Sequence, residues 1–209
     1  MSTSVRLESI DFLHFCLHKI ATAAGMSSCH AGHIADAIVF AHRQGKLNQG
    51  LGVYEAIDIA LEAGVLDPVA IPECVDEGPA YAVFDGQQSS GYYTLSLMAA
   101  AAIEKARSSG IAIAFGANHN DAGSFAHYVH MAYEQDMVGI ASNNTVPLAA
   151  PYGGMENQLS CPPFDAIIPS GDEPPIWASL KFAEWYDADI SEAVQEQKSM
   201  KGQWLIDPV

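Results

Sequence analysis

Hydrophobic residues in the first third of the chain recur at the spacing of an α-helix. One run begins at Phe12 and stops at Gly25, and a second follows Ser27 and Ser28, either of which can cap a helix. A third run covers residues 53–63 and also ends at a glycine, a common helix stop. We therefore expect three helices in this part of the chain.

The pattern changes after the third helix. Residues 81–84 form a short strand candidate, and residues 95–110 carry an amphipathic stripe that is closed by a glycine. Two apolar runs, 111–115 and 137–142, are typical of buried strands, and a helical pattern at 125–132 separates them. Helices and strands that alternate in this order predict a parallel β-α-β crossover.

The remaining sequence is less regular. Residues 146–164 are rich in proline and glycine, which predicts a long ordered loop, while residues 165–169 favour a strand and residues 189–197 a last helix. The expected fold class is α/β. A helical amino-terminal region, 1–75, precedes an α/β cofactor and substrate domain, 76–209, with a mixed sheet and a β-α-β crossover. One continuous domain is the alternative.

The composition favours a packed globular protein. Of the 209 residues, 49% are hydrophobic and 16% are charged, which permits a core and argues against disorder. The net charge of −16 would be repelled by nucleic acid and by anionic membranes, so we expect neither as a partner. The amino terminus shows no signal-peptide pattern and the alanine-rich run at 95–102 is too short to span a bilayer, which indicates a cytoplasmic protein.

Cysteines and histidines do not form a recognisable metal motif. The four cysteines lie far apart without a C-x-x-C spacing, which leaves two disulfides open but matches neither a secreted disulfide framework nor a zinc knuckle. Three histidine pairs have the spacing of neighbours on a helix, yet no third ligand follows at a usual distance. We therefore predict no metal. The residues are Cys16, Cys29, Cys74 and Cys161, and the pairs His14 with His18, His30 with His33, and His127 with His130.

Polar residues follow both of the predicted strands that flank the helix at 125–132. In parallel sheets, ligands bind beyond the carboxyl ends of the strands. If both strands point the same way, the two polar clusters face one crevice. The first cluster is Asn118, His119, Asn120 and Asp121, and the second is Asn143, Asn144 and Thr145.

His119 is the group in these clusters with an intrinsic pKa near neutrality, which suits it to proton transfer or to polarising a carbonyl. The expected helix amino terminus near Ser124 adds exposed N–H groups for a carboxylate or phosphate. The alternative is that these residues only form a turn and cap the helix. No glycine-rich dinucleotide or phosphate fingerprint, and no nucleophile elbow, is present in the sequence.

Three segments carry a family resemblance: YEAIDIALEAGVLDP, AVFDGQQSSGYYTLSLMAAAAIEKARSSGIAIAFGANHN and HYVHMAYEQDMVGIASNNTVPLAAPYGGMENQLS. The chain resembles the amino-terminal two-thirds of the malate/L-lactate dehydrogenase family, which is distinct from the Rossmann-type lactate dehydrogenases. The resemblance implies an α/β fold that binds NAD or NADP, a homodimer, and a small-molecule carboxylic acid as partner. The acid would be a 2-oxo, 2-hydroxy or cyclic imino acid. Family chains continue beyond this one, so the fold would be truncated at its carboxy terminus.

Several positions depart from the family pattern. The family has a Ser-His-Gly motif, whose histidine is the proton donor, followed by an arginine that holds the substrate carboxylate. This chain has Asn48, Gln49 and Gly50 at the motif and Val53 at the arginine position. Glutamine cannot donate a proton at neutral pH and valine cannot pair with a carboxylate. His119 matches a family histidine that lies beside the cofactor.

These observations define the candidate site and three hypotheses. The first is a divergent NAD(P)-dependent oxidoreductase with a rearranged site. The second is a non-redox protein on the same scaffold, which binds a ligand or partner or catalyses another reaction. The third is an inactive remnant that needs a separate carboxy-terminal piece. The candidates are His119 and Gln49 for catalysis, Asn48, Asn143 and Asn144 for substrate, and His119, Asn120, Asp121 and Ser124 for the cofactor.

Overall fold

The computed structural model describes residues 9–46, 49–144, 147, 149–160, 162–181, 193–194 and 197–199. Its first part is helical, as expected: α1 (Ile10–Ala23), α2 (Ser28–Arg43) and α3 (Tyr54–Glu62), the last preceded by a short 3-10 turn. The Ser27 side chain caps α2 by accepting a hydrogen bond from the backbone N–H of His30. The helical periodicity of the sequence therefore located all three helices.

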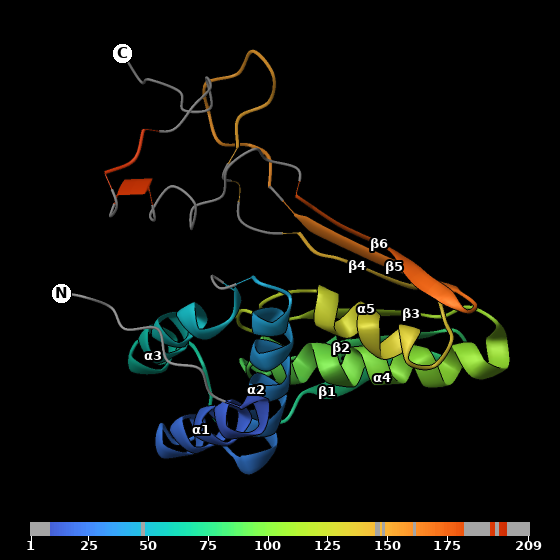
Figure 1. The fold of residues 1–209 in the computed structure, drawn as a ribbon, viewed down its shortest axis with the longest axis horizontal. Helices are drawn as coiled ribbons and strands as arrows, with labels where there is room; N and C mark the ends of the chain where they lie inside the picture. Colours follow the sequence, from blue (N-terminus) through green and yellow to red (C-terminus); the bar gives the residue numbers. More distant parts are fainter. Residues whose placement is uncertain are drawn as a thin grey trace.

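A mixed three-stranded sheet follows the helices (Figure 1). Strand β1 (Glu73–Gly78) pairs antiparallel with β2 (Tyr81–Asp85), and β2 pairs parallel with β3 (Ile113–Ala117). Helix α4 (Gly91–Ser109) connects the two parallel strands and ends at Gly110, whose φ of 81° is left-handed. The mixed sheet and its β-α-β crossover are confirmed, and the crossover is β2-α4-β3.

The second sheet is entirely antiparallel. After α5 (Ala126–Tyr133), strands β4 (Gly139–Ser142), β5 (Pro163–Ser170) and β6 (Glu173–Lys181) pair in chain order. The parallel crossover expected between residues 111–115 and 137–142 is therefore wrong, because β3 and β4 belong to different sheets. The chain returns after β4 and pairs with it antiparallel as β5, and β4 is an edge strand of that second sheet.

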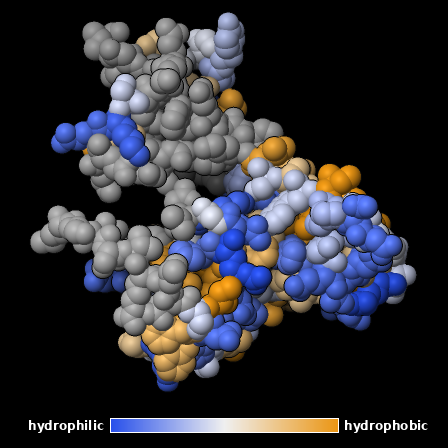
Figure 2. Space-filling model, in the orientation of Figure 1, coloured by the Kyte–Doolittle hydropathy of each residue, from blue (hydrophilic) through white to orange (hydrophobic). Residues whose placement is uncertain are grey.

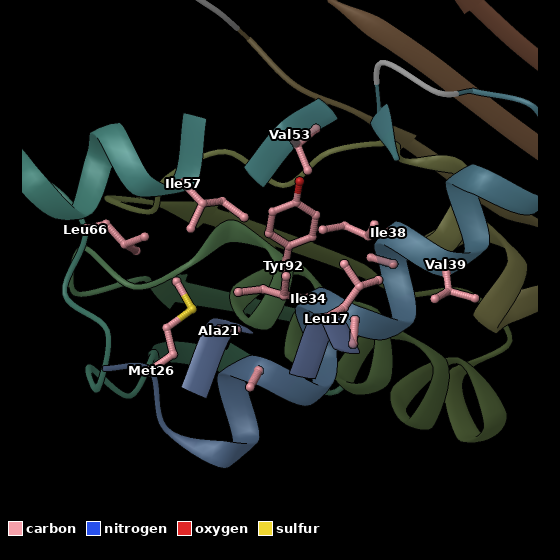
Figure 3. Close-up of a cluster of buried hydrophobic side chains, with 13 residues drawn as sticks. Leu17, Ala21, Met26, Ile34, Ile38, Val39, Val53, Ile57, Leu66 and Tyr92 are labelled. Carbon is pink, nitrogen blue, oxygen red and sulfur yellow. The ribbon is translucent and has the colours of Figure 1, made fainter. Parts of the chain in front are cut away.

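Helices α4 and α5 lie between the two sheets (Figure 1). Helix α4 packs on β2 and β3 and also touches α5, which in turn packs on β4 and β5. The largest buried cluster joins α1, α2 and α3 to Tyr92 at the start of α4 (Figure 3). Strand β1 spans the boundary expected at residue 75, and this cluster also reaches across it, so the division into 1–75 and 76–209 stays a prediction.

Each sheet carries apolar side chains on its other face. Ile113 and Phe115 of β3 are 51% and 54% exposed, and Ile140 of β4 is 67% exposed. The expectation that both strands are buried is therefore wrong, because the helices among the described residues cover one face of each sheet. Hydrophobic surface lies along the second sheet (Figure 2), where Ile168 and Ile176 are also exposed.

Two expectations from the sequence cannot be followed in full within the described residues. The last helix, expected at 189–197, is described only at residues 193–194 and 197. The two disulfides that the sequence left open would also involve Cys161, which lies outside the described residues. Cys16, Cys29 and Cys74 are free thiols. Among the described helices, none has the length and apolar content needed to cross a bilayer.

Candidate functional site

The loops that follow β2 and β3 interlock at the carboxyl ends of these parallel strands. The Gly86 N–H donates to Ala117 O at 2.8 Å, and the Gln88 N–H donates to Asn118 O at 2.7 Å. The Asn120 N–H donates back to Ser89 O at 3.0 Å. We call these two segments, residues 86–90 and 118–124, the strand-end loops. They occupy the place where open α/β sheets bind ligands.

Asn120 ties the strand-end loops to the helical region. Its side-chain Nδ2 donates to Val65 O and to Gln88 O, both at 2.9 Å. The loop also packs tightly against α4, since a Cβ added at Gly91 would lie 2.2 Å from Asn120 O. Asn120 was predicted to bind the cofactor, but both N–H groups of its side-chain amide donate to backbone carbonyls of the chain and hold the loop in position.

His119 is half-buried and has one free ring nitrogen. Its Nδ1 lies 2.8 Å from Asn120 O. A carbonyl oxygen only accepts, so this hydrogen bond assigns the proton to Nδ1 and leaves the lone pair of the neutral ring on Nε2. No hydrogen bond from a described residue reaches Nε2. The ring can therefore accept a proton at Nε2, and once charged it can donate one there.

The second predicted cluster lies apart from the first in the sheet topology. Asn143 and Asn144 follow β4, in the other sheet, and both are exposed. Asn144 Oδ1 accepts a hydrogen bond from Ser160 Oγ at 2.8 Å. No hydrogen bond between described residues joins this cluster to His119. Because β3 and β4 belong to different sheets, sheet pairing does not bring the two clusters into the single crevice that was expected.

The positions that depart from the family motif lie before α3. Asn48 is outside the described residues, and the Gln49 N–H donates to Lys46 O at 3.0 Å. Val53 is buried in the largest core cluster, beside Tyr92 (Figure 3). The valine side chain thus packs in the core and offers no group to a carboxylate.

Lys46 is a residue that the sequence analysis did not single out. Its Nζ donates to Ser179 Oγ of β6 at 2.7 Å and to Ser124 Oγ at 3.3 Å. This ammonium therefore links the Gln49 turn to the loop that also carries His119. Ser124 itself is buried and precedes α5, whose N-cap position is Phe125. Local patterns could not reveal this contact because the serines lie 78 and 133 residues from Lys46.

A cavity of about 430 Å³ lies between α1, α2 and α5, and none of the predicted site residues lines it. His14 Nε2 lies 2.8 Å from Asp36 Oδ1 on its wall. Burial lowers the pKa of His127 to about 4, although the nearby Asp36 carboxylate acts in the opposite direction. Within the part of the chain that the structure describes, no three histidine, cysteine or acidic side chains are grouped to hold a metal ion.

Comparison with known proteins decides the ancestry. Residues 9–209 match the family described as Malate/L-lactate dehydrogenase. The chain belongs to this family. Malate dehydrogenase of Pyrococcus horikoshii is 34% identical over 170 residues, which cover 78% of this chain and 46% of that protein. L-sulfolactate dehydrogenase of Methanocaldococcus jannaschii is 32% identical over 163 residues, which cover 78% of this chain and 47% of that protein.

Solved structures of the malate/L-lactate dehydrogenase family share the fold. The sulfolactate dehydrogenase of Methanocaldococcus jannaschii superimposes with a TM-score of 0.84 at 27% identity, over 92% of this chain and 56% of that one. The chain thus spans about half the length of the relatives that it matches. Its helical region, both sheets and the strand-end loops all lie within residues 9–209, which match the family.

Proposed function

We propose that this chain forms part of an NAD(P)-dependent oxidoreductase that acts on a small 2-oxo, 2-hydroxy or cyclic imino carboxylic acid. The observation that carries the proposal is the pair of strand-end loops, which hold His119 with a free Nε2 at the carboxyl ends of two parallel strands. The relatives named malate dehydrogenase and sulfolactate dehydrogenase support the substrate class, since their names denote small hydroxy acids.

The strand-end loops fit a dinucleotide in their chemistry. Ser90, the N-cap of α4, has a buried hydroxyl that makes no hydrogen bond to a described residue. Ser90, Ser124 and the exposed Asp121 are therefore the residues that we expect to hold NAD or NADP, which would supply or receive the hydride.

His119 is the expected proton donor and acceptor of this site. Its Nδ1 proton is held by Asn120 O, so any exchange with a substrate oxygen or nitrogen passes through Nε2. Gln49, at the position of the family histidine, has no titratable group. A positioned acid or base contributes about 10²- to 10⁴-fold in rate, so the reaction would lose most of its rate without His119.

Dinucleotide binding tests the proposal directly. We expect NADH or NADPH to quench the tryptophan fluorescence of the chain in a saturable manner, and oxaloacetate or sulfopyruvate to oxidise the bound nicotinamide. His119→Gln should retain dinucleotide binding within about threefold and lose about 10²-fold or more in kcat, because only the proton transfer is removed. His18→Gln, on α1, is the matched control. The absence of saturable quenching by either nucleotide would disprove the oxidoreductase.

A non-redox protein on the same scaffold is the second candidate. Val53 is packed in the core and Gln49 cannot donate a proton, so both positions that the family uses for the reacting acid have lost that chemistry. In this case the chain would bind the acid without binding a dinucleotide. We further propose a cytoplasmic location, a homodimer and no metal cofactor. Sedimentation equilibrium of the purified chain tests the homodimer, and metal analysis tests the absence of a metal.

A further inference from the structure

Lys46 places a positive charge at the meeting point of three distant segments. The turn after α2 carries the residue, Ser124 lies in the strand-end loop that leads to α5, and Ser179 lies on β6. An ammonium has three N–H donors, and these two serine hydroxyls account for two of them. One donor and the full positive charge remain for another group.

The groups around Lys46 do not neutralise this charge. Both hydrogen-bonding partners are neutral hydroxyls, and no carboxylate of a described residue lies within 4.0 Å of Nζ. The chain has 25 acidic residues, so a structural counter-ion would have been easy to supply. A hydrogen bond from this ammonium to an anion would be stronger than those to the two neutral hydroxyls, so the remaining donor suits an anionic group.

Asp165 is a buried carboxylate that lies across the β5-β6 ladder from Ser179. It pairs with Ser179 across the β5-β6 ladder, so the two side chains project from the same face. Asp165 is 3% exposed and its Oδ1 makes no hydrogen bond to a described residue. It forms no ion pair with Lys46 within 4.0 Å, so it does not occupy the free donor.

We propose that Lys46 binds the carboxylate of the substrate acid, in place of the arginine that Val53 replaces. The inference rests on the proposed function, because it assigns a residue to the acid of that reaction. Ser124 connects the two groups: it accepts a hydrogen bond from Lys46 and belongs to the same loop as His119. One loop would therefore position both the anion-binding ammonium and the proton-transferring imidazole.

Direct binding of L-malate to the full chain tests Lys46 without any turnover. We expect Lys46→Met to weaken malate binding about 10- to 100-fold in calorimetry, which is the usual effect of losing a charged hydrogen bond. Lys46→Arg should keep the affinity within about threefold, because the charge and the donors remain. Lys19→Met is the matched control, since Lys19 lies on α1 with its Nζ 5.6 Å from the Phe15 ring centre.

Three further measurements separate this role from a structural one. Dimethyl malate, which has no charge, should bind neither wild type nor Lys46→Met. A wild-type chain that binds malate but not NADH or NADPH would disprove the oxidoreductase and leave the Lys46 assignment standing. If Lys46→Met does not fold, wild type labelled with ¹⁵N-lysine should show a malate-dependent shift of the signal that Lys46→Arg lacks. Equal malate affinity of Lys46→Met and wild type, no malate binding by wild type, or no such shift overturns the inference.

Discussion

The contact between α4 and the strand-end loops gives a sharp test of the site architecture. Gly91 is the first residue of α4, and a Cβ added there would lie 2.2 Å from Asn120 O and 2.6 Å from Asp121 O. Both atoms are backbone, so no side chain can rotate away to make room. Gly32, within α2, offers a matched control because a Cβ added there meets nothing within 4 Å.

The expected free energies have opposite signs. Gly32→Ala should stabilise the protein by about 0.5–1 kcal/mol, since alanine loses less conformational entropy in a helix than glycine does. Gly91→Ala must displace the loop backbone by about 1 Å to reach ordinary contact, and overpacking of this kind costs about 1–3 kcal/mol. For a chain of 209 residues, each kcal/mol shifts Tm by about 2–4 °C.

Denaturant and thermal unfolding of the two variants measure these values. We expect the Tm of Gly91→Ala to fall by about 2–12 °C and that of Gly32→Ala to rise by about 1–4 °C. Ligand affinity should fall only in Gly91→Ala, because the displaced loop carries His119. A Gly91→Ala protein that is as stable as wild type, or one that binds ligand equally well, would show that the loop does not pack on α4 as described.

Two further predictions concern buried hydroxyls and histidines. The Tyr92 hydroxyl is buried without a hydrogen bond to a described residue, whereas the Tyr54 hydroxyl donates to Leu17 O at 2.7 Å. Urea unfolding should therefore show Tyr92→Phe to be about 1 kcal/mol more stable than wild type and Tyr54→Phe about 1 kcal/mol less stable; equal effects would contradict the assignment. Because burial lowers the pKa of His127 to about 4, the unfolded chain binds more protons between pH 6.5 and 4, and stability should fall across that window by up to about 3 kcal/mol. His127→Gln should flatten this fall, and an unchanged profile would exclude His127 as its source.

The helices of this fold were predictable because their signals are local. Ser27 caps α2 and Gly110 terminates α4 at the positions that the sequence indicates. Strands were harder, and β6 was missed because Pro174 and Pro175 argue against a strand interior. The structure resolves this conflict by placing β6 at the edge of its sheet, where a missing N–H donor can be tolerated.

The same distinction explains the errors at the second sheet. A run such as residues 137–142 indicates a strand, but it does not encode which strand will be its neighbour. The partner of β4 is β5, which begins 21 residues after β4 ends, so the pairing joins segments that no local pattern connects. Apolar runs also predict burial only where a second layer covers them, and β3 and β4 each present one apolar face without such a layer among the described residues.

The residues of the candidate site also differ in whether local sequence or long-range contacts determine their positions. The position of His119 just after a strand was predictable from local sequence, while its role in the site stays a prediction. The contacts of Lys46 were not predictable, because they depend on serines 78 and 133 residues away. The family motif directs attention to positions 49 and 53, but packing has drawn Val53 into the core. If the chain retains the chemistry of its family, the charge and the proton must come from other elements. The loop at residues 118–124 is where they converge, since it holds His119 at one end and reaches Lys46 through Ser124 at the other.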